Sequence, residues 1–303
     1  FMAGDEGELV ILTATSGDTG SAVAHAYHGV PRVQSVVLFP VAEVSARQRR
    51  QMTTLGGNVT TFAVDGKFDD CQAMVKRAFA DPALTGIRLS SANSINLGRL
   101  LPQSVYYVYA SQIFQGAYSK KPTIIIPSGN VGNATAAYWA FTMGAPIQQI
   151  ALAVNENRTI VDYLESGVYQ GRSSVQTLAN AMDVGDPSNM ERLFALYPTL
   201  EEMRAVVTAW SVDDEAIKET IKEVYTESGY ILCPHTATAE RVRRDHFPDT
   251  PSIIVSTAHP AKFEETVEPL IGSSVEVPPQ LAELLDKKSE YHSIAADYTL
   301  LFE

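Results

Sequence analysis

The sequence predicts an α/β fold with mostly parallel sheets, and three observations support this prediction. Short apolar, β-branched runs alternate with helix-favouring segments along the chain, which is typical of strand–helix–strand units. The run 123–126 is apolar almost throughout, as expected for a parallel strand that is covered on both faces. With 303 residues, of which 45% are hydrophobic and 19% are charged, the chain is also large enough to bury the cores of two domains.

The expected elements before residue 98 alternate regularly. We expect strands at 9–13, 35–39, 59–64 and 87–90, and helices at 21–27, 45–55 and 69–79. Gly29 and Pro31 end the first helix, and Gly56 with Gly57 ends the second. These elements form a smaller α/β domain, residues 1–98.

The second set of elements belongs to a larger domain, residues 99–303. It begins with a long helix that reaches about residue 114, and continues with strands at 123–126, 150–154 and 253–255. A helix is expected at 134–143, and the region 156–230 reads as mostly helical with an irregular patch at 180–189. We place the domain boundary in the turn-rich stretch before Arg99.

Composition excludes several classes of partner. A net charge of −12 argues against nucleic acid and against anionic membrane surfaces, because both bind basic faces. No apolar run approaches the ~18–20 residues of a membrane span. Cys71 and Cys233 lie far apart in the sequence, so we expect buried core residues in a reducing, cytoplasmic protein and no redox pair.

Three polar loops follow expected strands, where α/β folds bind their ligands. The first, 15–20, combines glycines and three hydroxyls before a helix, which suits either an anion or an ordinary helix cap. Its Asp18 would repel an anion, so we expect it to make a specific hydrogen bond. The second loop, 127–133, lacks the lysine of a mononucleotide-binding loop, but its amides suit a single phosphate.

The third loop, 90–99, carries two asparagines, several serines and Arg99 before a helix. An arginine at this end of a helix opposes the helix dipole. An anion bound between Arg99 and the helix start would resolve that conflict, although a surface ion pair would also satisfy Arg99. Three such loops together predict several anionic groups, such as a phosphorylated cofactor and a phosphorylated or carboxylated substrate.

Six short motifs occur in order over most of the chain, from about residue 9 to about residue 272. They are Thr13-Ala-Thr-Ser-Gly-Asp-Thr-Gly20, Ser91-Ala-Asn-Ser-Ile-Asn96, Pro127-Ser-Gly-Asn-Val-Gly-Asn133, Asn180-Ala-Met-Asp-Val184, Pro187-Ser-Asn189 and Thr257-Ala-His-Pro-Ala-Lys-Phe263. Together they resemble the longer bacterial and fungal class of the threonine synthase family. The resemblance implies a two-domain fold type II enzyme, similar to tryptophan synthase β chains, that depends on pyridoxal 5'-phosphate. It also implies conversion of O-phospho-L-homoserine and water to L-threonine and phosphate, by a monomer or homodimer.

The same resemblance implies roles for individual residues. The cofactor phosphate would lie on Ser128, Gly129, Asn130, Val131, Gly132 and Asn133. Thr257 would pair with the pyridine nitrogen, and Asp18 would lie at the cofactor's O3′ edge. Thr15, Ser16 and Thr19 would face the substrate carboxylate. Asn93, Ser94, Asn96 and Arg99 would bind the substrate phosphate.

The lysine that carries the cofactor in this family lies upstream of the first loop, in a Phe-Lys-Asp context. We therefore expect an N-terminal part beyond this sequence, and the catalytic lysine stays unassigned. None of the nine lysines matches that context; Gly66-Lys-Phe-Asp69 only reverses it, so we read Lys67 as a solvated turn residue. Lys262 lies in a family motif at a different position.

Two alternatives to threonine synthase stay open. A phospholyase that acts on the same substrate and releases 2-oxobutyrate would need the same loops. A non-catalytic protein that binds phosphate or an amino acid follows if the cofactor-bearing lysine is truly missing.

Six other polar residues invite a functional reading, and two of them are closely spaced histidines. His25 and His28 have a spacing that suits a metal, but no cysteine or carboxylate completes a set, so we expect no metal. Asp183 and Asp186 are expected to cap loops. For His235 and His259, structural and active-site roles are equally compatible with the sequence.

Overall fold

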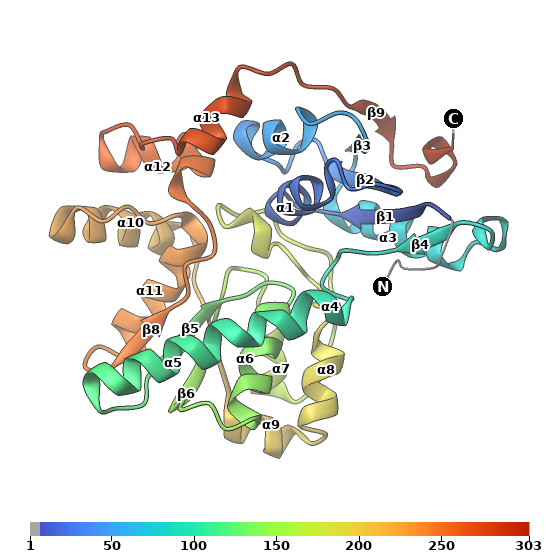
Figure 1. Ribbon diagram of the computed structural model, residues 1–303. Helices are drawn as coiled ribbons and strands as arrows, with labels where there is room; N and C mark the ends of the chain where they lie inside the picture. The colour runs from blue at the N-terminus through green and yellow to red at the C-terminus, as the bar shows by residue number, and fades with distance from the viewer. Residues whose placement is uncertain (1–6, 303) are drawn as a thin grey trace. The chain divides into compact units, whose positions relative to one another are not determined.

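Two separate parallel sheets organise the chain. The computed structural model describes residues 7–302 and divides into two units, one of Phe1–Asn93 with Val277–Glu303 and the other of Ser94–Glu276. Each unit has its own sheet and helices (Figure 1). The expected α/β class with parallel sheets is confirmed.

The first unit has five parallel strands in the order β4-β1-β2-β3-β9. The strands are β1 Leu9–Ala14, β2 Val33–Pro40, β3 Val59–Asp65, β4 Arg88–Ser90 and β9 His292–Ala295. The helices are α1 Asp18–Tyr27, α2 Ala46–Thr53, α3 Phe68–Ala80 and α13 Pro279–Leu285. The order reverses between β3 and β4, so right-handed crossovers place α1 and α2 on one face and α3 on the other (Figure 1).

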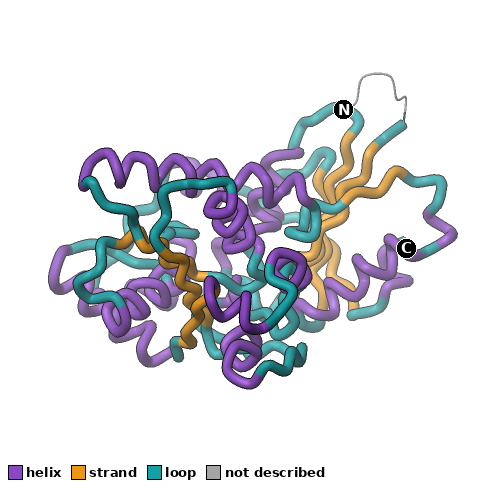
Figure 2. Tube along the Cα trace, turned by 90° about the horizontal axis from the view of Figure 1, so that it is seen from below, coloured by secondary structure: helices purple, strands orange, loops and turns teal. Residues whose placement is uncertain are grey.

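The second unit has four parallel strands in the order β7-β6-β5-β8. Figure 2 distinguishes the strands, in orange, from the helices, in purple. They are β5 Thr123–Pro127, β6 Gln149–Val154, β7 Val207–Ser211 and β8 Ser252–Ile254. The helices are α4 Leu97–Leu100, α5 Ser104–Tyr118, α6 Gly132–Thr142, α7 Thr159–Ser166, α8 Met190–Leu196, α9 Leu200–Val206, α10 Asp214–Ser228, α11 Pro234–His246 and α12 Glu264–Ile271. As predicted, β5 is covered on both faces: Ile124, Ile125 and Ile126 are at most 1% exposed.

The core of the second unit explains the rigid setting of the loop that follows β5. Helix α6 packs on the sheet through small residues, among them Ala134, Ala136 and Ala137, which are fully buried with Ile124 and Leu152. Small side chains let the helix backbone approach the strands closely. The start of α6 is therefore fixed against the carboxyl ends of β5 and β6.

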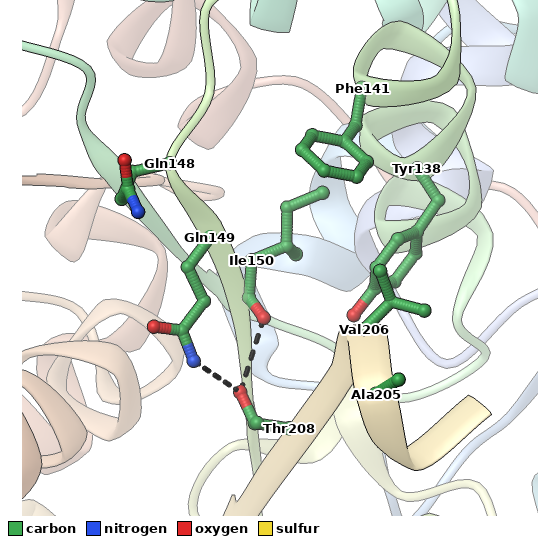
Figure 3. Close-up of a pocket in the computed structure, with 8 residues that line it drawn as sticks. All are labelled: Tyr138, Phe141, Gln148, Gln149, Ile150, Ala205, Val206 and Thr208. Atoms are coloured by element: carbon green, nitrogen blue, oxygen red, sulfur yellow. Dashed lines mark hydrogen bonds between the residues drawn. The ribbon is translucent and has the colours of Figure 1, made fainter. Parts of the chain in front are cut away.

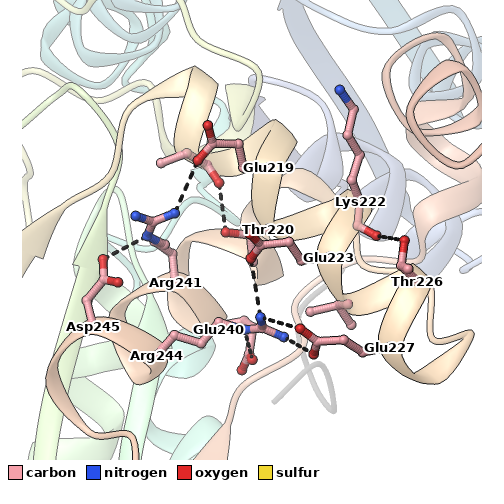
Figure 4. Close-up of polar contacts among 12 residues, drawn as sticks. Glu219, Thr220, Lys222, Glu223, Thr226, Glu227, Glu240, Arg241, Arg244 and Asp245 are labelled. Atoms are coloured by element: carbon pink, nitrogen blue, oxygen red, sulfur yellow. Dashed lines mark hydrogen bonds and ion pairs between the residues drawn. The ribbon is translucent and has the colours of Figure 1, made fainter.

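Helices α10 and α11 are joined by ion pairs (Figure 4). Arg244 on α11 reaches Glu227 and Glu223 on α10 at 2.6 and 3.3 Å, and Glu240 on its own helix at 2.7 Å. Arg243 also pairs with Glu240, at 2.8 Å. Burial alone would raise the pKa of Glu240, but the hydrogen bonds from Arg243 and Arg244 outweigh it and lower that pKa.

The chain departs from the expected elements in three places. The long helix after residue 96 is broken into α4, a 3₁₀ turn at Leu101–Gln103 and α5, because Pro102 lacks the N–H that a continuous helix needs. Strand β7 lies inside the region expected to be mostly helical. Strand β9 follows the strand expected to be last, and its only large apolar side chain is Ile294.

The units also differ from the expected domains. Pairing of β9 with β3, from Phe62 opposite His292 to Asp65 opposite Ala295, joins residues after 277 to the first unit. The expectation had placed all residues after 98 in the larger domain. The first boundary falls at Asn93, five residues before the expected one.

Candidate active site

The loop that joins β5 to α6 is closed on itself by side-chain hydrogen bonds. Ser128 Oγ donates to Asn133 Oδ1 at 2.8 Å, and Asn133 Nδ2 donates to the carbonyl of Pro127 at 2.9 Å. The amide of Ser128 continues the sheet by donating to Ala153 at 2.9 Å. The loop predicted to hold a phosphate is thus anchored at both ends.

The amides of this loop are available to a ligand. Within residues 7–302, no acceptor takes a hydrogen bond from the amides of Gly129, Asn130, Val131, Gly132 and Asn133. Val131 caps α6 in the left-handed conformation, with φ 61°, which is strained for a β-branched residue. Unsatisfied amides at the start of an 11-residue helix suit a phosphate dianion.

Neighbouring segments determine which residues this loop tolerates. A Cβ on Gly129 would lie 2.5 Å from Cα of Met182, so the two backbones touch and no side chain fits there. A Cβ on Gly132 would lie 3.1 Å from Cβ of Ser94 and 3.3 Å from Nδ2 of Asn189. The motif around 180–189 therefore supports the underside of the loop.

Ser94, in the third polar loop, joins that loop to the second one, and both lie in the second unit. Its Oγ accepts hydrogen bonds from Asn130 Nδ2 at 2.7 Å and from Asn189 Nδ2 at 3.0 Å. A hydroxyl has two acceptor lone pairs and one proton, so these bonds leave the proton of Ser94 for another acceptor. Asn130 Oδ1 in turn accepts from the amide of Ser188 at 2.7 Å.

Asn96 and Arg99 lie at the beginning of α4. Asn96 is the N-cap: its Oδ1 accepts from the amide of Gly98 at 2.9 Å, and its side chain is exposed. Arg99 is half-buried in the same helix. Arg192 fixes the preceding residue, because its Nη2 donates to the carbonyl of Ile95 at 2.7 Å.

The loop after β1 belongs to the first unit. Thr15 is fully buried, and its Oγ1 accepts from the amides of Gly17 at 2.9 Å and Gly20 at 2.8 Å. Gly17 has φ 134°, which only glycine adopts readily. Asp18 accepts from Nε2 of the buried Gln48 at 3.2 Å, and this is the specific hydrogen bond expected for that carboxylate. Ser16 and Thr19 are partly exposed.

Asn93 has a structural position in the first unit. Its Nδ2 donates to the carbonyl of Ala14 at 2.5 Å, and its Oδ1 accepts from the amide of Ala14 at 3.0 Å. The side chain therefore imitates a neighbouring strand at the end of β1. Asn93 was predicted to bind the substrate phosphate. In the structure its side chain instead binds the backbone of Ala14, just before the loop 15–20.

Thr257 lies just beyond the carboxyl end of β8, and its side chain is exposed. His259, two residues later, caps the following turn, because its Nδ1 accepts from the amide of Ala261 at 3.1 Å. Lys262 lies in that 3₁₀ turn, and Lys67, the N-cap residue of α3, is exposed as expected.

Other candidate residues have structural partners. His235 is 2% exposed, and its Nε2 accepts from the amide of Ala181 at 3.1 Å. Asp183 and Asp186 stabilise loops as expected, since Asp183 accepts from the amide of Thr177 and Asp186 from the hydroxyl of Tyr169. No group of metal-binding side chains is found among residues 7–302. Both cysteines are buried and free, as expected of core residues.

A cavity of about 230 Å³ lies elsewhere in the second unit, at the amino end of β6 (Figure 3). Its lining includes Tyr138, Phe141, Ile150 and Thr208, and none of the eight lining residues is charged. The polar loops lie at the carboxyl ends of the strands, where parallel sheets bind ligands. The cavity is therefore separate from the candidate active site.

Several residues of this site were missed in the sequence. Gln48 has no sequence feature that links it to Asp18. Ser188 and Asn189 stand in a family motif, but their role was not foreseen; their hydrogen bonds to Asn130 now supply it. Nothing in the sequence associates Asn155 and Asn157 with Asp183, although both donate to its carboxylate.

Comparisons with known proteins identify the family of the chain. Residues 3–257 match the family "Pyridoxal-phosphate dependent enzyme", and residues 236–301 match "Threonine synthase, C-terminal". The chain is 41% identical over 302 residues to threonine synthase from Escherichia coli, covering 99% of this chain and 70% of that protein.

Solved structures show the same relationship. The crystal structure of Escherichia coli threonine synthase matches with a TM-score of 0.88 and 40% identity, over 97% of this chain and 69% of that one. A pyridoxal-phosphate-bound threonine synthase from Brucella melitensis matches with a TM-score of 0.88 and 33% identity, over 99% of this chain and 70% of that one. The chain belongs to the threonine synthase family of pyridoxal-phosphate-dependent enzymes.

Proposed function

We propose that the chain converts O-phospho-L-homoserine and water to L-threonine and phosphate. The observation that carries the proposal lies at the start of α6. There the five consecutive backbone amides of residues 129–133 donate no hydrogen bond to any acceptor within residues 7–302. The family of the chain supplies the reaction, and this loop supplies a place for the phosphate of its cofactor.

The residues present fit the phosphate group of pyridoxal 5'-phosphate. Ser128, Gly129, Asn130, Val131, Gly132 and Asn133 would hold it through backbone amides and the start of α6. The bound cofactor supplies an electron sink for carbanion chemistry. Thr257 would offer a neutral hydroxyl to the pyridine nitrogen, and Asp18, held by Gln48, would lie at the O3′ edge.

Ser94, Asn96 and Arg99 would bind the substrate phosphate. The hydroxyl proton of Ser94 is left to donate because Asn130 and Asn189 occupy its lone pairs. Arg99 adds a positive charge that stabilises phosphate as it leaves. Ser16 and Thr19 would bind the substrate carboxylate, while Thr15 and Asn93 shape the backbone of that loop.

Product analysis tests the proposal. The protein is incubated with pyridoxal 5'-phosphate and O-phospho-L-homoserine, and phosphate, threonine and 2-oxobutyrate are quantified. Threonine equal to the released phosphate is the expected result. An equal amount of 2-oxobutyrate would instead identify a phospholyase, and saturable phosphohomoserine binding without turnover would identify a binding protein.

We further propose that the protein acts on a small-molecule substrate in the cytoplasm and is a monomer or homodimer. The net charge of −12 and two free, buried cysteines support this setting. No described helix is both long and apolar enough to cross a membrane. Light scattering after size-exclusion chromatography would give the oligomeric state, and a mass above that of a dimer would contradict it.

A further inference from the structure

Asp183 lies at the centre of a buried polar network in the second unit. The residue is 6% exposed, and its Oδ1 accepts from Asn155 Nδ2 and Thr177 Oγ1, both at 2.7 Å, and from Asn157 Nδ2 at 3.3 Å. Its Oδ2 accepts from the amide of Thr177 at 2.9 Å. These four groups are donors, so the carboxylate, which only accepts, suits this position.

The network fastens a loop to the end of strand β6. Asn155 follows the last residue of β6, and Asn157 holds Val175 by two hydrogen bonds, Nδ2 to the carbonyl at 2.8 Å and the amide to Oδ1 at 2.7 Å. Asp183 then joins Thr177 from the far end of the loop. The segment 175–183 is thereby closed and tied to the strand that neighbours β5.

The fastened segment ends against the loop proposed to hold the cofactor phosphate. Met182, the residue before Asp183, places its Cα 2.5 Å from where a Cβ of Gly129 would be. On its other side the segment is held by His235, which accepts from the amide of Ala181 at 3.1 Å. A shift of Asp183 would move the backbone of Met182, and with it the support beneath Gly129.

We propose that Asp183 is a positioning residue that sets the loop 128–133 for the cofactor phosphate by holding the backbone of Met182 against Gly129. The inference rests on the proposed role of that loop. Asp183 acts through Met182 and need not touch the cofactor. Its removal should weaken cofactor binding by more than its effect on folding explains.

The test compares Asp183→Asn with Glu240→Gln. Both variants change a mostly buried carboxylate of the second unit to an amide, but Glu240 belongs to the ion pairs between α10 and α11. The affinity for pyridoxal 5'-phosphate is measured by equilibrium dialysis, the ³¹P resonance of the bound cofactor by NMR, and folding without cofactor by circular dichroism.

We expect Asp183→Asn to raise the dissociation constant about tenfold or more and to move the ³¹P resonance, because an amide N–H would face other donors. Glu240→Gln should leave both within experimental error of the unmodified protein. If Asp183→Asn does not fold, Thr177→Val removes one hydroxyl donor to the same carboxylate and should give a smaller effect in the same direction.

A folded Asp183→Asn variant with unchanged affinity and an unchanged ³¹P resonance would overturn the inference, and so would equal changes in Glu240→Gln. An unmodified protein that binds no pyridoxal 5'-phosphate would instead refute the role of the loop itself. The two failures are thus distinguishable.

Discussion

Thr13 and Thr15 lie two residues apart and are both fully buried, yet only Thr15 uses its hydroxyl. Thr15 Oγ1 accepts from the amides of Gly17 and Gly20, whereas Thr13 Oγ1 has no hydrogen-bond partner among residues 7–302. The hydroxyl of Thr15 therefore stabilises the loop that follows β1, whereas the hydroxyl of Thr13 is buried without a hydrogen bond.

This pair predicts opposite effects of the same isosteric change. Thr15→Val leaves two buried amides unsatisfied and should destabilise the first unit by about 1–3 kcal/mol. Thr13→Val removes an unpaired hydroxyl and should be neutral or stabilising. Urea unfolding followed by circular dichroism measures both, and equal destabilisation would show that the hydroxyl of Thr15 does not hold the loop.

Arg99→Ala should raise KM for O-phosphohomoserine strongly. A charge-assisted hydrogen bond to phosphate is worth ~1.5–3 kcal/mol, which corresponds to roughly a tenfold to hundredfold change in KM. Arg204→Ala is the control, because Arg204 is exposed and, within residues 7–302, donates only to the carbonyls of Leu164 and Glu165. Steady-state kinetics that give the same KM for both variants and for the unmodified protein would remove Arg99 from the substrate site.

Glu240 should make the stability of the second unit depend on pH. Its pKa is lowered in the folded state, where the hydrogen bonds from Arg243 and Arg244 outweigh burial, so the unfolded chain takes up its proton first as the pH falls. The stabilisation is therefore complete above the unfolded pKa of about 4.3 and is lost as the pH falls through the lower folded value.

Glu240→Gln removes this titration. The variant should be less stable at neutral pH, and its difference from the unmodified protein should shrink below about pH 4. Urea unfolding at several pH values measures the difference. A difference that stays constant down to the acid limit would contradict the assigned pKa shift.

Hydrophobic patterning was sufficient to predict the buried strands. The apolar runs that became β1, β5 and β6 are fully or mostly buried, so burial and sequence pattern agree there. Strand β9 was not predicted, because backbone pairing with β3, and not side-chain burial, keeps it in the sheet. Three of its four residues are exposed. Such a strand has almost no apolar pattern in the sequence. The residues after 277 were therefore assigned to the larger domain and not to the first unit.

The sequence predicted the loops of the candidate site, but not the hydrogen bonds that individual side chains in them make. Thr15 and Asn93 stand where a ligand contact was predicted, and both use their side chains on backbone groups of their own unit. Short polar side chains serve ligands and backbone equally well, so only the folded chain separates the two uses. Ser94 instead bonds to side chains far away in the sequence: Asn130 is 36 residues and Asn189 is 95 residues from it. Local sequence cannot predict such contacts.

Cofactor affinity of Gly129→Ala tests the central claim, the phosphate loop, most directly. A Cβ at Gly129 would lie 2.5 Å from backbone Cα of Met182, whereas a Cβ at Gly116 on α5 meets nothing within 4 Å. Equilibrium dialysis should show that Gly129→Ala loses pyridoxal 5'-phosphate, while Gly116→Ala binds it normally and gains ~0.5–1 kcal/mol of helix stability. Normal cofactor content in a folded Gly129→Ala variant would contradict the assignment of loop 128–133 to the cofactor phosphate.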